Sequence, residues 1–82
     1  MTETRQILLT EMVDEQHGVV VEIRGGHQAI ERLHVLGIRP GKKVTKVGAM
    51  MLRGPVTIQM DNHQVAMGHS MAGRVVIELS KP

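Results

Sequence analysis

The sequence predicts a mainly β fold, a small closed or half-closed barrel of about five strands with one short helix between the first two clear strands. Several short segments alternate hydrophobic and polar residues at period two, which is typical of half-buried strands. One further segment, which lies between two of these, has the spacing of a helix. The 82 residues are expected to form a single domain, residues 1–82, because a chain of this length is short for two.

Residues 28–36 are predicted to form the helix, and turn residues bound it on both sides. Ala29, Leu33 and Leu36 fall on one face, while the opposite face is largely polar. Gly37 follows the last periodic residue, where a helix favours a left-handed cap. The residues expected to set these turns and to pack the helix are Gly25, Gly26, Leu33, Leu36, Gly37, Pro40 and Gly41.

The clear strands are expected at residues 18–24, 42–48, 55–60, 63–67 and 74–79. In the second of them Val44 and Val47 have opposite parity, which predicts a bulge or a strong bend there. Asp61-Asn62 is a strong signal for a two-residue hairpin turn. The apolar residues 7–9 form either an edge strand or a cover over one mouth of the barrel.

The composition excludes several kinds of site. The chain has no Cys, which removes disulfides, thiolate zinc sites and cysteine nucleophiles together. It also has no Phe, Tyr or Trp, so the core has to be built from Val, Ile, Leu and Met. Nucleic acid is disfavoured as a partner, because single strands are bound by stacking on aromatic side chains.

Neither an enzyme nor a membrane span is expected. Ser70 lies next to His69, but residues adjacent in sequence rarely place an imidazole correctly, and no third group is evident. No stretch approaches the roughly 20 apolar residues that a membrane span needs. The polar start of the chain does not resemble a signal peptide, so a cytoplasmic location is expected.

The candidates for a metal site are His27, Glu31 and His34, which project from the polar side of the predicted helix. Imidazole and carboxylate ligands suit Fe²⁺ or Zn²⁺. A solvated helix face is made of the same residue types, and one ion would strain to reach both histidines, which are two turns apart. No cofactor is therefore expected beyond weak or adventitious binding of Fe²⁺ or Zn²⁺.

A basic stretch is the candidate for a docking surface. Five cations occur there without an acid between them, namely Arg39, Lys42, Lys43, Lys46 and Arg53. They suit an acidic partner surface, although a solvated set of charges is the simpler interpretation. The adjacent methionines of the following loop either contact a partner or fold back over the barrel. The hypothetical docking surface consists of Arg39, Lys42, Lys43, Met50, Met51 and Arg53.

Self-association is a further interaction that the sequence leaves open. Val35 lies on the polar side of the predicted helix, where an apolar side chain is compatible with a contact between two copies. A single exposed valine does not decide between a monomer and a homo-oligomer. Met60 and Met67, by contrast, occupy inward strand positions and are expected to fill the core.

The chain resembles the FeoA family over nearly its whole length. The most specific part is Arg32-Leu33-x-x-Leu36-Gly37-Ile38-x-Pro40-Gly41. The other matching parts, in order, are Gly18-Val19-Val20-Val21-Glu22-Ile23, Gly25-Gly26, Val44, Gly54-Pro55-Val56, Val65-Ala66 and Ala72-x-x-Val75-x-Ile77. The same domain is similar to the C-terminal module of DtxR-type metal-dependent repressors.

The resemblance implies an SH3-like barrel that serves ferrous iron transport as an accessory protein and has no enzymatic activity. It implies docking on the cytoplasmic GTP-binding region of FeoB, a membrane permease, so that any membrane association would occur through the permease. The motif residues, Gly54 and Pro55 included, set turns and packing, and no catalytic set follows from them. The alternatives are a metal-sensing or metal-binding barrel and, less favoured, a small barrel that binds nucleic acid.

Overall fold

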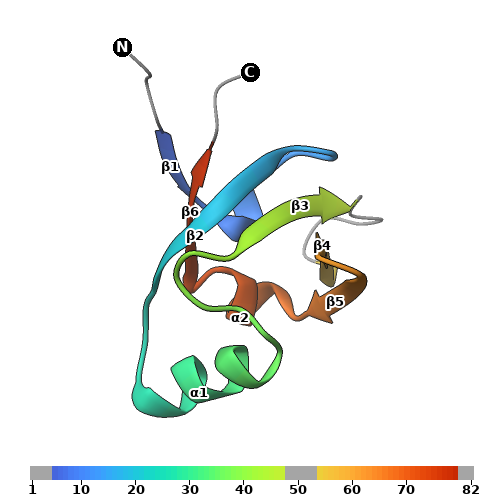
Figure 1. Cartoon of the computed structure of the whole chain (residues 1–82). Helices are drawn as coiled ribbons and strands as arrows, with labels where there is room; N and C mark the ends of the chain where they lie inside the picture. The colour runs from blue at the N-terminus through green and yellow to red at the C-terminus, as the bar shows by residue number, and fades with distance from the viewer. Residues whose placement is uncertain (1–4, 48–53, 80–82) are drawn as a thin grey trace.

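The computed structural model describes residues 5–47 and 54–79, which form one six-stranded sheet with short helical segments (Figure 1). The elements in chain order are β1 (Arg5–Leu8), the 3₁₀ turn η1 (Leu9–Glu11), β2 (His17–Ile23), α1 (His27–Val35), β3 (Lys43–Val47), β4 (Val56–Met60), β5 (His63–Met67), α2 (His69–Ala72) and β6 (Val75–Leu79). The predicted mainly β fold with a helix between the first two clear strands is confirmed. The sixth strand is β1, which pairs with β6 as an edge strand.

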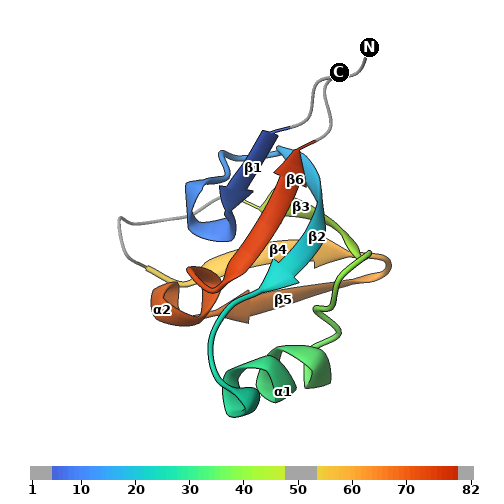
Figure 2. The same ribbon diagram turned by 90° about the vertical axis from the view of Figure 1, so that its left-hand side faces the viewer.

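The strand order in the sheet is β1-β6-β2-β3-β4-β5, and every neighbouring pair is antiparallel. The sheet curls strongly, so that the β4–β5 hairpin crosses the direction of β2 and β6 (Figure 2). Within the described residues β1 and β5 are the two edges of the sheet. Because β1 and β5 do not pair with each other in the described residues, the barrel is half-open.

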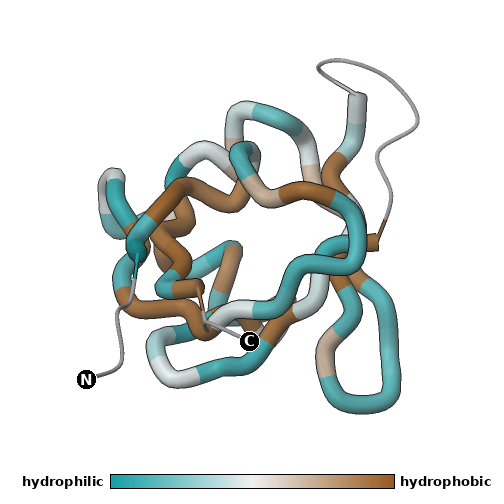
Figure 3. The backbone as a smooth tube through the Cα atoms, turned by 90° about the horizontal axis from the view of Figure 1, so that it is seen from above, coloured by the Kyte–Doolittle hydropathy of each residue, from teal (hydrophilic) through white to brown (hydrophobic). Residues whose placement is uncertain are grey.

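The core lies inside this curled sheet and consists of aliphatic and methionine side chains. Val56, Ile58 and Met60 of β4 are buried at alternate positions, and Met67 of β5 joins them, as their parity predicts. Hydrophobic stretches of the strands alternate with hydrophilic turns around the molecule (Figure 3). Each such side chain contributes about 1.5–3 kcal/mol when it is fully buried.

The bulge predicted for residues 42–48 lies in β2 instead, so that prediction was wrong. The pairing of β2 with β6 shifts register between Val20 and Glu22, whereas β3 pairs with β4 in regular register. The inward position of β3 after Val44 is Lys46, which is 4% exposed. Val47 has the outward parity and is half-buried, so β3 alternates regularly without a bulge and its second inward position is a lysine.

Lys46 is tolerated inside because its ammonium group has a hydrogen-bond acceptor. Its Nζ donates to the backbone O of Met12 at 3.0 Å. On the backbone, the Lys46 N–H donates to the Gln16 carbonyl at 2.9 Å, and the Glu15 N–H donates to the Lys46 carbonyl at 2.8 Å. The two backbone bonds hold the turn before β2 against β3. The bond from Nζ offsets the cost of burying the ammonium group, which would be high without a partner.

Helix α1 begins after Gly26 and ends in the left-handed glycine that the sequence predicts. Gly37 has φ +92°, its N–H donates to the His34 carbonyl at 2.9 Å, and the N–H of Ile38 donates to the Leu33 carbonyl at 2.9 Å. This pair of bonds is a Schellman motif. Leu33 and Ile38 are both fully buried, so the cap also fixes the helix to the core.

The hairpin between β4 and β5 turns at Asp61-Asn62, as predicted. Asp61 has φ +44°, whereas Asn62 is not among the residues with positive φ, so the turn is not of type I′, in which both central residues have positive φ. The turn matters for the surface, because it brings an acidic side chain next to the basic segment that begins β3.

Replacing Gly18 by Ala is expected to lower the free energy of unfolding by about 1–3 kcal/mol. A Cβ on Gly18 would lie 2.3 Å from Cγ2 of Ile77 and 3.0 Å from the Glu78 carbonyl oxygen, so β2 and β6 would have to separate. Gly68→Ala is the control, because nothing lies within 4 Å of a Cβ there. Chemical denaturation measures both, and equal losses would contradict the close approach of the two strands.

Candidate functional site

The hypothetical docking surface is only partly within the described residues. Met50, Met51 and Arg53 lie outside them, and Arg39, Lys42 and Lys43 lie in the connection from α1 to β3 and at the start of β3. Lys46, the fourth cation of the basic stretch, is buried and does not contribute to the surface. Arg39 and Lys43 are exposed, whereas Lys42 is half-buried.

Lys42 is paired with an acid that the basic stretch itself does not contain. Its Nζ donates to Oδ2 of Asp61 at 2.5 Å, across the contact between the start of β3 and the β4–β5 hairpin. The hydrogen bond from Lys42 and then its charge lower the pKa of the Asp61 carboxyl below its ordinary value. The charge of Lys42 is thus compensated locally, and Lys43 and Arg39 supply the basic character of this surface among the described residues.

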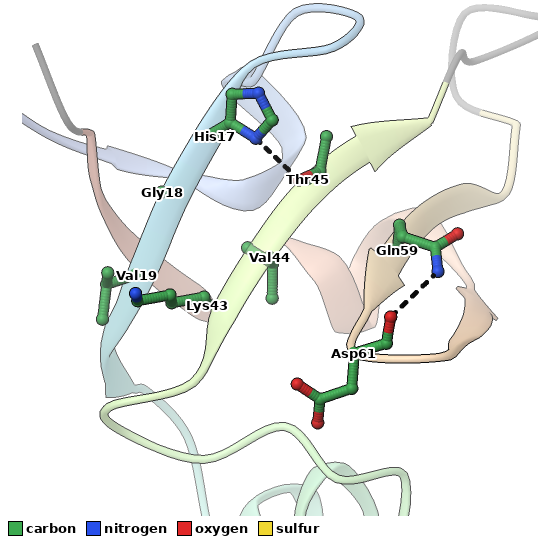
Figure 4. Close-up of a pocket in the computed structure, with 8 residues that line it drawn as sticks. All are labelled: His17, Gly18, Val19, Lys43, Val44, Thr45, Gln59 and Asp61. Carbon is green, nitrogen blue, oxygen red and sulfur yellow. Dashed lines mark hydrogen bonds between the residues drawn. The ribbon is translucent and has the colours of Figure 1, made fainter. Parts of the chain in front are cut away.

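A polar hollow of about 360 Å³ lies beside this ion pair on the outer face of β2, β3 and β4 (Figure 4). Nδ1 of His17 and Oγ1 of Thr45 are hydrogen-bonded at 2.8 Å, since the two residues face each other in register. In Figure 4 the Lys43 side chain extends toward Val19 of β2, while Gln59 lies on the β4 side, where its Nε2 donates to the backbone O of Asp61 at 3.4 Å. Polar side chains from three strands and the carboxylate of Asp61 thus line this hollow.

Sequence reasoning missed this hollow because its residues come from separate strands. His17 and Thr45 are 28 positions apart and meet only through the β2–β3 register. Asp61 was recognised as a turn residue and not as the partner of Lys42, 19 positions away. The signal that could have found the pair is the hairpin itself, which returns the chain toward β3.

The metal candidates do not gather into a three-ligand site among the described residues. Nε2 of His27 lies 3.7 Å from Oε2 of Glu31, and the two side chains are 89% and 68% exposed. No group of three His, Cys, Asp or Glu side chains able to hold an ion is found in residues 5–47 and 54–79. His34 is exposed near the end of α1.

An apolar groove of about 400 Å³ separates α1 from β5 and α2. Leu36 of the predicted apolar face is 38% exposed, so that face is only partly buried, and Val35 on the polar side is 85% exposed. The sequence indicated that Val35 faces outward, but not that a groove lies beside it. The residues that line the groove are Arg32, Val35, Leu36, Ala66, Met67, Gly68 and Met71.

Lys42→Met is expected to raise the pKa of Asp61 toward the ordinary aspartate value of about 3.9, because the variant removes the hydrogen bond and the charge that lower it. Since the folded-state pKa is depressed, the stabilisation from Asp61 is complete above about pH 4 and is lost as the pH falls through the folded-state pKa. Carbon-detected NMR titration measures the shift. Lys43→Met is the control, and an equal shift there would contradict the assignment to Lys42.

Fe²⁺ and Zn²⁺ are expected to bind the His27–Glu31 pair no tighter than about millimolar, because protein sites that hold zinc firmly use three or four protein ligands. Isothermal titration of the purified protein measures this. His34→Ala should leave the titration unchanged, and His27→Ala should remove what binding there is. Micromolar affinity that His34→Ala abolishes would establish a site that includes both histidines.

Comparison with known proteins agrees with the fold. The sequence model of the FeoA domain matches residues 7–79. A crystal structure of an iron uptake regulatory protein, FeoA, is 33% identical with a TM-score of 0.85, and the match covers 92% of this chain and 100% of that one. No relative was found among curated protein sequences.

Two more distant structures show the same fold. A FeoA-like protein from Clostridium acetobutylicum is 18% identical with a TM-score of 0.82, and the match covers 94% of this chain and 90% of that one. A manganese-dependent transcriptional repressor is 18% identical with a TM-score of 0.84, and the match covers 96% of this chain and 44% of the repressor. At these identities the likeness extends to the fold alone.

None of the helices in residues 5–47 and 54–79 has the length and apolar character required to cross a bilayer. The fold is the SH3-like fold of FeoA structures, as the resemblance implied. Because the family model spans residues 7–79 and the FeoA crystal structure matches over its full length, this chain belongs to the FeoA family, whose members take part in ferrous iron transport.

Proposed function

We propose that this protein is a non-enzymatic, cytoplasmic accessory protein of ferrous iron uptake that docks on the cytoplasmic GTP-binding region of a FeoB-type permease. Family membership carries the proposal, since the chain is 33% identical to a protein described as an iron uptake regulatory protein. Docking would let so small a domain adjust transport or GTP turnover without chemistry of its own. Any association with the membrane then occurs through the permease.

The described side chains support a binding role over catalysis. The hydroxyl–imidazole contact between Thr45 and His17 is the one of its kind in residues 5–47 and 54–79, and no acid is hydrogen-bonded to the ring there. A nucleophile of this type requires a base that a third group orients. Ser70 and His69 are both exposed on α2. The arrangement suits recognition of a partner better than attack on a substrate.

The proposed docking surface is the basic one, and Lys43 is its most informative residue. Lys43 is exposed beside the polar hollow, while the neighbouring Lys42 is held by Asp61. An acidic partner surface would gain more from Lys43, which has no acid within ion-pair distance among the described residues, than from Lys42. Arg39 lies on the same connection, and Met50, Met51 and Arg53 extend the proposed surface beyond the described residues.

Metal sensing does not carry over from the repressors that share the fold. The likeness to the manganese-dependent repressor is 18% in sequence and shows the fold alone. The described residues also provide the pair His27–Glu31 without a third ligand. Docking on a permease therefore has more support than a metal-sensing role.

Lys43→Glu is expected to weaken binding to the permease's GTP-binding region by about tenfold, or about 1.4 kcal/mol, because it places like charge against an acidic surface. Arg5→Glu on β1 changes the net charge equally and should alter affinity by less than about twofold. NMR titration of the isotope-labelled chain, with and without a GTP analogue, measures both affinity and location.

The titration also tests the proposed function itself. Localised shifts near Lys43 and Arg39 in the unmodified chain support docking through the basic surface. Equal weakening by Arg5→Glu would mean that the attraction is unspecific charge. The absence of any shift in either nucleotide state would refute docking on this region of the permease.

A further inference from the structure

The β5 strand has an open edge with a defined set of backbone groups. It pairs with β4 on one side, and no described strand pairs with its other side. In a hairpin with a two-residue turn, the flanking residues form a hydrogen-bonded pair and the pairing alternates from there. Counting from His63, the residues that direct N–H and C=O away from β4 are Gln64 and Ala66, both of which are exposed.

The residues of this edge provide none of the usual protection against strand addition. Edge strands are commonly guarded by Lys, Pro, a bulge or a covering element. The residues of β5, from His63 to Met67, include neither Lys nor Pro, and they pair with β4 at five consecutive positions without a register shift. The opposite edge, β1, is one residue shorter and begins at Arg5. An unprotected edge that persists in a folded protein suits recognition.

The apolar groove runs beside this edge. Val35 and Leu36 at the end of α1 form one wall, and Met67 and Met71 lie on the β5 and α2 side. Helix α1 lies below β5 in the view of Figure 2, so the groove opens next to the unpaired side of the strand. Arg32 is the one charged residue that lines it, and no described carboxylate lies within ion-pair distance of Arg32.

We propose that the open edge of β5 accepts an extended segment of a partner protein as an added strand, with an apolar side chain in the groove and an acidic side chain on Arg32. Main-chain bonds to Gln64 and Ala66 provide affinity in this mode of recognition, and alternate side chains provide specificity. The inference rests on the proposed function to the extent that the segment belongs to the cytoplasmic region of the permease.

Charge favours a partner protein over a second copy of this chain. Two copies pairing through β5 would be related by a two-fold axis, which sets the same groove opposite itself. The groove contains Arg32 and no acid, so a second copy would bring no carboxylate to the guanidinium from this surface. A segment that alternates apolar and acidic side chains satisfies both the groove and the arginine.

Ala66→Pro is the variant that tests strand addition. Proline removes the outward N–H and is tolerated on an edge strand whose N–H faces away from the sheet. We expect it to weaken binding of the permease's GTP-binding region by about tenfold. Ala66→Val keeps the N–H, so it should weaken binding less than Ala66→Pro does. Arg32→Glu should weaken binding by about tenfold through the side-chain contact.

Amide hydrogen exchange on the unmodified chain tests the same inference without relying on a variant that folds. With the permease region added, the amides of Gln64 and Ala66 should gain protection of at least about tenfold, while the amides of the opposite edge strand β1 should not change. Equal loss of affinity in Ala66→Pro and Ala66→Val would overturn the assignment to the backbone.

The possible outcomes separate this inference from the proposed function. Binding with changes confined to the Lys43 and Arg39 surface overturns strand addition and leaves the docking function intact. Protection at Gln64 and Ala66 that appears in the protein alone and rises with its concentration means that a second copy takes the edge, which also overturns the inference. No change at any amide refutes the docking function and the inference together.

Discussion

Because the chain has no Phe, Tyr or Trp, its interior is closed by aliphatic and methionine side chains that come from every strand of the sheet. Residues of this size fill only a narrow space, so the sheet has to curl and its strands have to approach closely. Gly18 allows β2 to lie directly against Ile77 of β6. Helix α1 contributes Leu33 to the same core and is fixed there by the cap that leads into Ile38.

The same constraint determines which surfaces stay available. The small core has room for one fully buried side chain of α1, Leu33. Leu36 is partly exposed and Val35 is largely exposed. Curling without closure leaves β5 as an edge next to these residues. On the outer face of β2 and β3, the side chains that point away from the core form the polar hollow with Lys43. The molecule thus has a basic polar surface and an apolar edge, and both suit binding.

Local sequence patterns predicted the elements whose causes are local. The left-handed Gly37, the two-residue turn at Asp61-Asn62 and the inward positions of β4 follow from backbone preferences and period-two burial. The bulge was predicted in the wrong strand, because a lysine is expected to face outward and the two valines around it then have opposite parity. Lys46 can occupy that position only because the Met12 carbonyl lies where its ammonium group ends, and that proximity is a property of the folded chain.

The sequence by itself determined the aromatic-free core, the capped helix, the hairpin and the family motif, since each depends on residues that are neighbours or occur at fixed short spacing. Only the tertiary structure decided the Lys42–Asp61 pair, the His17–Thr45 contact and the groove beside β5. Those features join residues from separate elements, and strand register and sheet curvature set their distances. Local propensity carries no information about either quantity, because both arise from how the whole sheet packs around its core.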